Sequence, residues 1–261
     1  MESFFIQPNG YKLFATWINR YDSFEKKPTL VFLHDSWGCV EMWGDFPQKL
    51  VEMSGLNALV YDRRGYGKSA PFDIRERTEE YLHEEAHELI RVLDACQIEH
   101  AVLYGHSDGA TIALLAGALY PERIKGLLLE GAHSFIEDSG KAAVLETRER
   151  AKETSLLNSL EKYHGDKTTE LFRLWHETWL SEYFAHWTIV PLLSKITCPV
   201  LAFQGENDEF GSIEQLNVLK KEIKGKVTIA EIKQAGHTPR KEAEEETMKW
   251  VRKFFLMIND K

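Results

Sequence analysis

The sequence predicts an α/β fold in which a mostly parallel central sheet of about eight strands is flanked by helices. Three observations predict it. Short apolar runs such as TLVFLH and HAVLYGH recur along the chain, and such runs are typical of strands buried on both faces. Segments with the apolar period of a helix separate most of these runs. A stretch of about 65 residues without a strand pattern predicts a helical insert after the sixth strand.

The chain begins with a predicted hairpin, in which residues 3–7 and 11–18 are joined by a turn at Pro8-Asn9-Gly10. This hairpin supplies an antiparallel edge to the sheet. The remaining strands are expected at 29–34, 57–62, 100–106, 125–131, 199–205 and 226–232. The helices between them are expected at 42–54, 77–96, 107–120, 212–223 and 239–255.

The strand-free stretch divides the chain into an α/β core, residues 1–134 and 196–261, and a helical cap, residues 135–195. Within the cap, LFRLWHETWLSEYFAHWTIV places aromatic residues at steps of three and four, which is one face of a helix. They are Phe172, Trp175, Trp179, Tyr183 and Trp187. Two interpretations remain open: the stripe packs the cap onto the core, or it roofs a pocket for an apolar substrate.

Composition excludes several classes of function. The 261 residues carry a net charge of -9, which argues against a nucleic-acid partner because phosphate binding relies on clustered Lys and Arg. Three scattered cysteines, Cys39, Cys96 and Cys198, supply neither a disulfide framework nor a thiolate metal site. No secretory signal and no apolar run of membrane-helix length is visible. The sequence therefore predicts a cytoplasmic protein without a membrane partner.

The segment HEEAH (83–87) spells the zinc signature H-E-x-x-H, in which His83 and His87 would bind the metal and Glu84 would act as general base. Zinc needs a third protein ligand, and the next element is a buried strand with a different motif. Both histidines also fall at or beyond the border of the apolar face of their helix. We interpret the segment as a solvated helix face and predict no metal.

The segment DRRGYGKS (62–69) ends like a phosphate-binding P-loop, but Asp62 stands where that motif requires a glycine. Pro71 follows, and no helix start is signalled. We therefore interpret it as a turn in which Gly65 and Gly67 adopt conformations that other residues resist.

The segment GHSDG (105–109) lies between a buried strand and an apolar helix, the context in which G-x-S-x-G presents a nucleophilic serine. The tight bend needs small residues at Gly105 and Gly109, and it directs Ser107 to the carboxyl edge of the sheet, where such folds bind ligands. The Asp108 N–H then lies at a helix N-terminus, where it can stabilise a negative oxygen.

A serine nucleophile needs a base, and the base needs an orienting acid. We assign the base to His237, in the loop between the last strand and the last helix. We assign the acid to Asp208, just after the strand at 199–205. Other candidates for the acid remain, namely Glu206, Glu209 and Glu130. Three further histidines lie at or beyond strand ends, His34, His106 and His133.

Taken together, FLHDSWG, DRRGYGKS, GHSDG, GENDE and GHTPR make the chain resemble an α/β-hydrolase-fold serine hydrolase with a helical cap. The order Ser107, Asp208, His237 is the order of that fold. The resemblance implies that Ser107 attacks a carbonyl, that His237 transfers the proton and that Asp208 orients His237. It also implies an oxyanion hole formed by the backbone N–H groups of Asp108 and Ser36.

The loop after the third strand departs from the family pattern, because Asp35 replaces the usual glycine. A carboxylate there would repel a developing oxyanion unless it were protonated or turned away. On that hypothesis Asp35→Gly raises activity on simple esters. We assign the substrate pocket to His34, Asp35, Trp37, Trp175 and Trp179.

The function expected from the sequence is cleavage of a small, partly apolar acyl substrate, with a carboxylic ester as the first choice, through an acyl-enzyme and without a cofactor. The alternatives are a C–C bond hydrolase, thioesterase or amidase with the same residues, or a ligand-binding protein without catalysis. The partner is then a small molecule. The sequence does not determine the oligomeric state and is compatible with a homo-oligomer.

Overall fold

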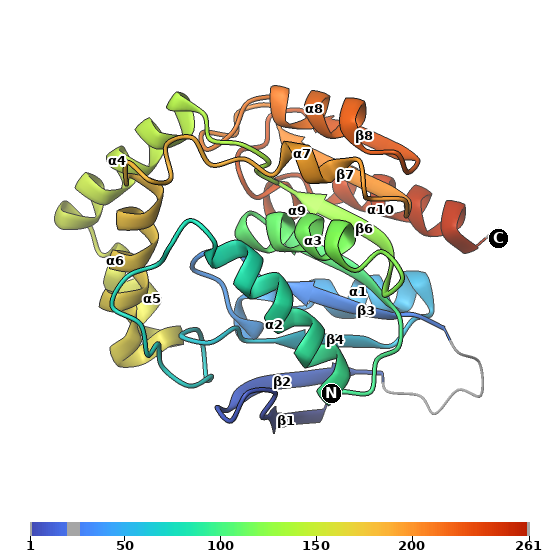
Figure 1. Cartoon of the computed structure of the whole chain (residues 1–261), viewed down its shortest axis with the longest axis horizontal. Helices are drawn as coiled ribbons and strands as arrows, with labels where there is room; N and C mark the ends of the chain where they lie inside the picture. Colours follow the sequence, from blue (N-terminus) through green and yellow to red (C-terminus); the bar gives the residue numbers. More distant parts are fainter. Residues whose placement is uncertain (1, 20–26, 260–261) are drawn as a thin grey trace.

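The sheet of this protein contains eight strands in the order β1-β2-β4-β3-β5-β6-β7-β8 (Figure 1). The structure is a computed structural model and describes residues 2–19 and 27–259. The pairs β1–β2 and β2–β4 are antiparallel, and the others are parallel. The strands are β1 (Glu2–Ile6), β2 (Leu13–Ile18), β3 (Thr29–Leu33), β4 (Ala58–Tyr61), β5 (Ala101–His106), β6 (Ile124–Glu130), β7 (Val200–Gly205) and β8 (Val227–Ile232).

Helices connect most of these strands and cover both faces of the sheet. They are α1 (Phe46–Ser54), α2 (Tyr81–Ala95), α3 (Asp108–Leu119), α4 (Asp138–Glu153), α5 (Leu156–His164), α6 (Thr168–Trp179), α7 (Val190–Leu193), α8 (Glu214–Glu222), α9 (Pro239–Glu242) and α10 (Glu244–Asn259), with 3-10 turns η1 (Val40–Trp43) and η2 (Gly165–Lys167). No described helix is long and apolar enough to cross a membrane.

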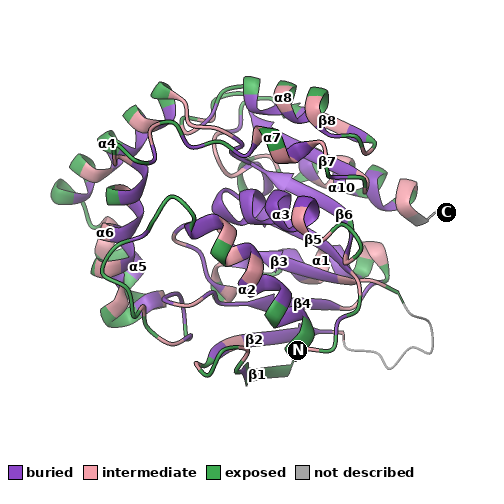
Figure 2. Ribbon diagram, viewed as in Figure 1, coloured by how far each residue is buried: buried purple, intermediate pink, exposed green. Residues whose placement is uncertain are grey.

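Alternation along the strands divides the apolar core between the two faces. In β3, Val31 and Leu33 join the cluster that packs against α2, α3 and α8, whereas Leu30 and Phe32 join the cluster against α1 and α10. Successive side chains of a strand point to opposite faces, so a strand covered on both sides must be apolar throughout. Figure 2 shows the result as buried central strands beneath helices that keep an exposed outer side.

The predicted sheet is confirmed, including its antiparallel hairpin edge and the parallel strands that follow. Two helical predictions were wrong in extent. The predicted helix 239–255 is interrupted at Ala243 and forms α9 and α10. The aromatic segment 171–190 is not one helix, because α6 ends at Trp179.

Side-chain hydroxyls explain where α6 ends. Thr178 donates its Oγ1–H to the Leu174 carbonyl at 2.6 Å, and Ser181 donates its Oγ–H to the Thr178 carbonyl at 2.7 Å. Hydroxyls that bond to nearby carbonyls compete with continued helical bonding. Tyr183 and Trp187 therefore lie beyond the helix; Tyr183 is exposed and Trp187 is buried.

The segment between β6 and β7 contains α4, α5, α6 and α7. Figure 1 shows α4, α5 and α6 standing apart from the helices that flank the sheet. We call α4, α5 and α6, with the intervening η2, the inserted helices. Residues from these helices and residues that follow β3, β5, β6, β7 and β8 line one cavity, described next.

Candidate active site

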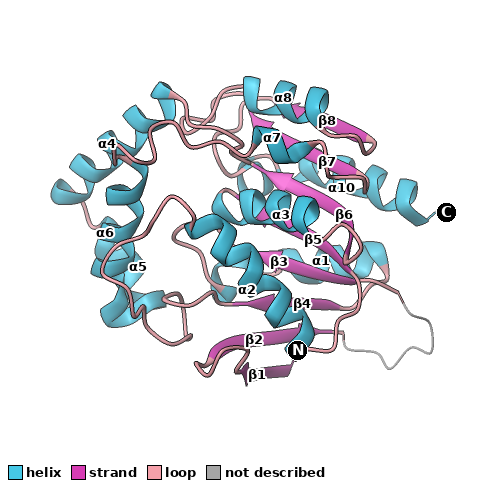
Figure 3. Cartoon of the chain, viewed as in Figure 1, coloured by secondary structure: helices cyan, strands magenta, loops and turns pink. Residues whose placement is uncertain are grey.

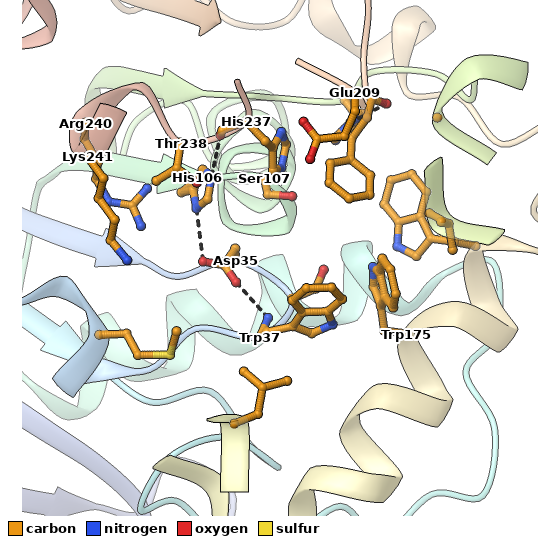
Figure 4. Close-up of a pocket in the computed structure, with 18 of the residues that line it drawn as sticks. Asp35, Trp37, His106, Ser107, Trp175, Glu209, His237, Thr238, Arg240 and Lys241 are labelled. Carbon is orange, nitrogen blue, oxygen red and sulfur yellow. Dashed lines mark hydrogen bonds and ion pairs between the residues drawn. The ribbon is translucent and has the colours of Figure 1, made fainter. Parts of the chain in front are cut away.

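A cavity of about 270 Å³ lies between the carboxyl ends of the strands and the inserted helices (Figure 4). Ligands of open α/β sheets bind at this edge. Of the residues predicted for the site, Asp35, Ser36, Trp37, Ser107, Trp175, Trp179 and His237 line the cavity. Sequence reasoning did not assign Met42, His106, His133, Val144, Leu160, Phe210, Thr238, Arg240 and Lys241 to it, and they line it as well.

Ser107 stands at a tight bend between β5 and α3. Its backbone has φ 54° and ψ -120°, a region that a residue with a side chain rarely adopts and that stores strain. A Cβ on Gly109 would lie 2.0 Å from the Leu33 carbonyl oxygen, and one on Gly105 would lie 2.3 Å from the Gly109 oxygen. Both glycines are therefore required for the close approach of β3, β5 and α3, as the motif predicts.

The structure brings His237 and Asp208 together although they come from different loops. His237 Nδ1 lies 2.9 Å from each carboxylate oxygen of Asp208, and Asp208 Oδ1 also accepts the Phe210 N–H at 2.9 Å. This contact fixes Nδ1 as the protonated nitrogen and leaves Nε2 able to accept a proton. The side chains of Ser107 and His237 both line the cavity, and Figure 4 shows them next to each other.

Charge pairing changes the pKa values of both groups. Burial alone lowers the pKa of His237, but the charge and hydrogen bond of Asp208 outweigh burial, so the pKa is raised above its usual value. Burial raises the pKa of Asp208, but the charge and hydrogen bond of His237 bring the net value below the usual range. The pair thus favours an ionised carboxylate beside a histidine that binds protons readily.

Two neighbours hold the loop that carries His237. The Glu242 carboxylate accepts the backbone N–H groups of Gly236 at 2.6 Å and Thr238 at 2.9 Å, on either side of His237. His106 Nε2 lies 2.9 Å from the His237 carbonyl oxygen. The break between α9 and α10 follows directly after Glu242, whose carboxylate is turned back toward this loop.

The other candidates for the orienting acid have different partners. Glu130 is fully buried, and it binds Arg240 Nη1 at 2.6 Å and the Tyr104 hydroxyl at 2.9 Å. Glu206 binds Lys233 at 2.9 Å. Glu209 lines the cavity, and no hydrogen bond joins it to His237 among the described residues. Asp208 is the carboxylate that contacts His237.

Asp35 is part of a second acid–histidine pair. Its Oδ2 lies 3.0 Å from His106 Nδ1, and its Oδ1 accepts the Trp37 N–H at 2.7 Å (Figure 4). Burial raises the pKa of Asp35, but the hydrogen bond and charge of His106, together with Arg240 and the Trp37 N–H, bring it well below the usual range. Both carboxylate oxygens therefore have partners, and the carboxylate is ionised.

The two predicted oxyanion donors lie on different elements. Asp108 is fully buried in the first turn of α3, where a backbone N–H has no partner within the helix. Ser36 lies in the loop after β3 and lines the cavity. The Asp108 side chain has a separate contact: its Oδ1 accepts a hydrogen bond from the Tyr81 hydroxyl at 3.3 Å.

One side of the cavity is aromatic. Trp37 packs edge-on against Trp175 with ring centroids 4.5 Å apart, and Trp175 also contacts Phe210 at 6.4 Å. His133, which follows β6, packs against Trp179 at 5.2 Å. The position of His133 just beyond a parallel strand was a signal that could have placed it here.

His34 does not line the cavity, so the pocket prediction for this residue is corrected. Its side chain is buried, with 1% of its surface exposed. Nε2 accepts the Arg63 N–H at 3.1 Å, and Nδ1 donates to the Asp35 carbonyl at 2.7 Å. His34 therefore contacts the loop after β4 and not the cavity.

The residues of the two rejected motifs have structural roles. In HEEAH, His83 pairs with Glu80 at 3.2 Å, and His87 Nδ1 lies 2.6 Å from the Tyr120 hydroxyl. No group of three metal-binding side chains occurs in residues 2–19 and 27–259. In DRRGYGKS, Gly65 has φ +86° and Gly67 has φ +47°, as expected of a glycine-dependent turn.

The alpha/beta hydrolase family model matches residues 30–250 of this chain. The chain belongs to the alpha/beta hydrolase family. A human protein named serine hydrolase BPHL is 27% identical over 180 residues, which cover 65% of this chain and 60% of that protein. Zearalenone hydrolase of Bionectria ochroleuca is 32% identical over 148 residues, which cover 56% of this chain and 53% of that enzyme.

Among solved structures, a serine hydrolase from Cycloclasticus zankles, a bacterium that degrades polyaromatic hydrocarbons, superposes with a TM-score of 0.80. It covers 100% of this chain and 99% of its own, at 17% sequence identity. The two proteins therefore share a fold over the full length of this chain. The names of these relatives support a hydrolytic enzyme, and this chain spans about three fifths or less of the curated relatives.

Proposed function

We propose that the protein is a serine hydrolase that cleaves a small, partly apolar acyl substrate, with a carboxylic ester as the leading choice. One observation carries this proposal. Ser107 occupies a strained backbone conformation at the wall of a cavity that His237 also lines, and Asp208 binds the far nitrogen of His237. A strained residue beside an oriented base is the arrangement that nucleophilic catalysis needs.

In the proposed reaction, the Ser107 hydroxyl attacks the substrate carbonyl while His237 Nε2 accepts its proton. The negative oxygen of the tetrahedral intermediate is stabilised by the N–H groups of Asp108 and Ser36. The intermediate collapses to an acyl-serine, and His237 returns the proton to the leaving alcohol. Water then attacks the acyl group with His237 again as base, which regenerates Ser107. These side chains and water suffice for each step.

The aromatic side of the cavity supports an apolar or aromatic acyl group. Trp37 and Trp175 line the cavity together with the reacting serine (Figure 4), and Phe210, which packs against Trp175, lines it as well. Burial of an apolar group there contributes roughly 25 cal/mol per Å² of apolar surface removed from water. We further propose that the inserted helices act as a cap, because α4, α5 and α6 supply Val144, Leu160 and Trp175 to this wall.

A fluorophosphonate probe tests for an activated serine. We expect a single adduct on Ser107, located by peptide mapping, and none in Ser107→Ala. Turnover of p-nitrophenyl esters should fall by at least about 1,000-fold in Ser107→Ala, since loss of a nucleophile removes most catalysis. Ser159→Ala, an exposed serine on α5, is the matched control and should label and react like the wild type.

The outcomes separate the alternatives. Labelling with turnover of aryl esters supports the esterase. Labelling with turnover of thioesters, amides or ring-cleavage diketones in place of esters assigns the same residues to one of those reactions. A protein that is never labelled, and whose Ser107→Ala variant binds apolar ligands unchanged, is a binding protein and contradicts the proposal.

A further inference from the structure

His164, the last residue of α5, connects the inserted helices to two loops of the sheet edge. Its side chain is buried, with 1% exposed. Nδ1 accepts the backbone N–H of Gly67 at 2.9 Å, in the loop after β4. Nε2 donates to the backbone carbonyl of Trp37 at 2.8 Å, in the loop after β3. One ring therefore joins three segments that are distant in the sequence.

Lys167 strengthens the attachment to the loop after β4. Its Nζ donates to the Gly67 carbonyl at 2.7 Å, so the N–H and the C=O of one residue are both bound by the inserted helices. Farther along this loop the Arg77 carbonyl accepts the Tyr183 hydroxyl at 2.7 Å. Figure 3 shows the loop between β4 and α2 extending toward α5 and α6.

The backbone N–H, the backbone carbonyl and the ring of Trp37 all have partners. Its carbonyl is bound by His164, and its N–H by the Asp35 carboxylate at 2.7 Å. Its ring packs against Trp175 at 4.5 Å and Phe172 at 5.8 Å, both on α6. The residue before it is Ser36, the proposed oxyanion donor. A shift of α5 or α6 would therefore displace the peptide next to that donor.

We propose that His164 is a positioning residue: it couples the docking of the inserted helices to the geometry of the loop after β3 (residues 34–38), and through that loop to the oxyanion hole. This inference rests on the proposed function for its kinetic consequence, but the mechanical coupling can be measured without a substrate.

The hydrogen-bond pattern requires one protonation state of the ring. Nδ1 must accept and Nε2 must donate, which only the neutral ring with its proton on Nε2 can do. Burial, the largest influence, lowers the pKa of His164, consistent with this state. The charged groups that act on the His164 ring are Lys167 on the inserted helices and Asp35 after β3. The loop after β4, whose Gly67 it binds, carries Asp62, Arg63, Arg64 and Lys68.

Two substitutions of His164 separate its hydrogen bonds from its volume. His164→Phe keeps an aromatic ring but leaves the Gly67 N–H and the Trp37 carbonyl unpaired. His164→Gln can restore a donor and an acceptor on a flexible chain. His186→Gln is the matched control, an exposed histidine of the segment between α6 and α7. If His164→Phe does not fold, Lys167→Met replaces it, because this variant loses only the hydrogen bond from Lys167 to the Gly67 carbonyl.

Kinetics with a p-nitrophenyl ester provide the first readout, at a temperature where all variants remain folded. We expect His164→Phe to lower kcat by about 10- to 100-fold with less than about a threefold change in KM, because misplacement by about 1 Å can cost about 100-fold in rate. His164→Gln should recover a large part of kcat, and His186→Gln should match the wild type. A lower melting temperature with unchanged kcat would mean that His164 only stabilises the fold, which overturns the proposal.

Hydrogen exchange provides the second readout and needs no substrate. The Gly67 amide should exchange faster in His164→Phe because its acceptor is gone. The decisive amides are those of Ser36 and Trp37, which His164 does not bind; we expect at least about tenfold faster exchange there. Faster exchange at Gly67 alone overturns the coupling. If exchange changes as expected but no variant turns over an ester, the proposed function fails and the coupling stands.

Discussion

At the residue scale, the charges around Asp35 determine how the loop after β3 tolerates a carboxylate. The Asp35 carboxylate faces the His106 ring, with Oδ2 3.0 Å from Nδ1, and it accepts the Trp37 N–H. The nearby Arg240, which also lowers the pKa of Asp35, is paired with Glu130. Both carboxylate oxygens are thus turned toward polar partners, which removes the reason to expect repulsion of an oxyanion.

Substitution of Asp35 tests this account. Asn can accept the Trp37 N–H and donate to His106, so Asp35→Asn should keep kcat within about threefold of the wild type. Asp35→Gly removes both contacts and adds backbone freedom, so we expect kcat to fall by about tenfold. Steady-state rates on a p-nitrophenyl ester measure both, with the exposed Asp166→Asn as control. A gain in rate for Asp35→Gly would restore the repulsion hypothesis.

At the element scale, the junction of β3, β5 and α3 depends on the absence of two side chains. Gly109 lies in the first turn of α3 and against the end of β3, whereas Gly117 lies in the last turn of the same helix. A Cβ at Gly117 would lie 3.1 Å from the Leu127 Cδ1 atom, at the end of a flexible side chain, and 3.8 Å from two Ile196 side-chain atoms. Of these two glycines in one helix, Gly109 therefore leaves no room for a Cβ, whereas Gly117 does.

We expect Gly109→Ala to lower the free energy of unfolding by more than about 3 kcal/mol, because its Cβ would overlap backbone that cannot move independently. Gly117→Ala should change it by no more than about 1 kcal/mol, since the helix gains propensity from alanine. Urea denaturation of the two variants gives the comparison. Equal, small effects at both positions would show that β3 and α3 can separate without cost.

Sequence patterns predicted the buried strands well, because a strand covered on both faces must be apolar throughout and leaves a continuous run. The helix ends were predicted less well. α6 ends early through the hydroxyls of Thr178 and Ser181, and such local bonds leave no trace in the apolar period. The break at Ala243 follows from the contacts of Glu242 with the His237 loop, which are tertiary.

Among the residues of the site, those set by a local motif were predictable, and those set by tertiary contacts were less so. Ser107 and its glycines were predictable because the strand–turn–helix geometry imposes a local motif. The contact of Asp208 with His237 was expected from their places at strand ends. The pairing of Asp35 with His106 was not, because those residues come from β3 and β5 and no spacing relates them. The position of Phe210 at the cavity and that of His34, buried away from the cavity, likewise depend on packing.

At the scale of the whole molecule, three histidines are buried in states that disfavour a charge. Burial is the largest influence on His34, His133 and His164, and it lowers the pKa of each. In the unfolded chain these rings bind protons near pH 6.5. As pH falls below that value the unfolded state takes up protons that the folded state does not, so each contributes a loss of stability on acidification.

The contribution of His164 can be isolated, although other groups act in the opposite sense. His237, Asp62 and Glu85 have raised pKa values, so each favours the folded state as pH falls. These groups are common to the wild type and to His164→Gln, and the effects of those that do not interact with His164 cancel in the difference between the two proteins.

Urea denaturation at pH 7.5 and pH 5.5 should therefore show a larger stability advantage of the wild type over His164→Gln at the higher pH. The upper limit for one histidine is about 1.4 kcal/mol per pH unit. His186→Gln should remain parallel to the wild type, because the His186 side chain is exposed and lies outside the contact with Gly67 and Trp37. An equal advantage at both pH values would mean that His164 binds its proton as readily when folded, and the neutral ring that joins Gly67 to Trp37 could not then be the form on which the fold depends.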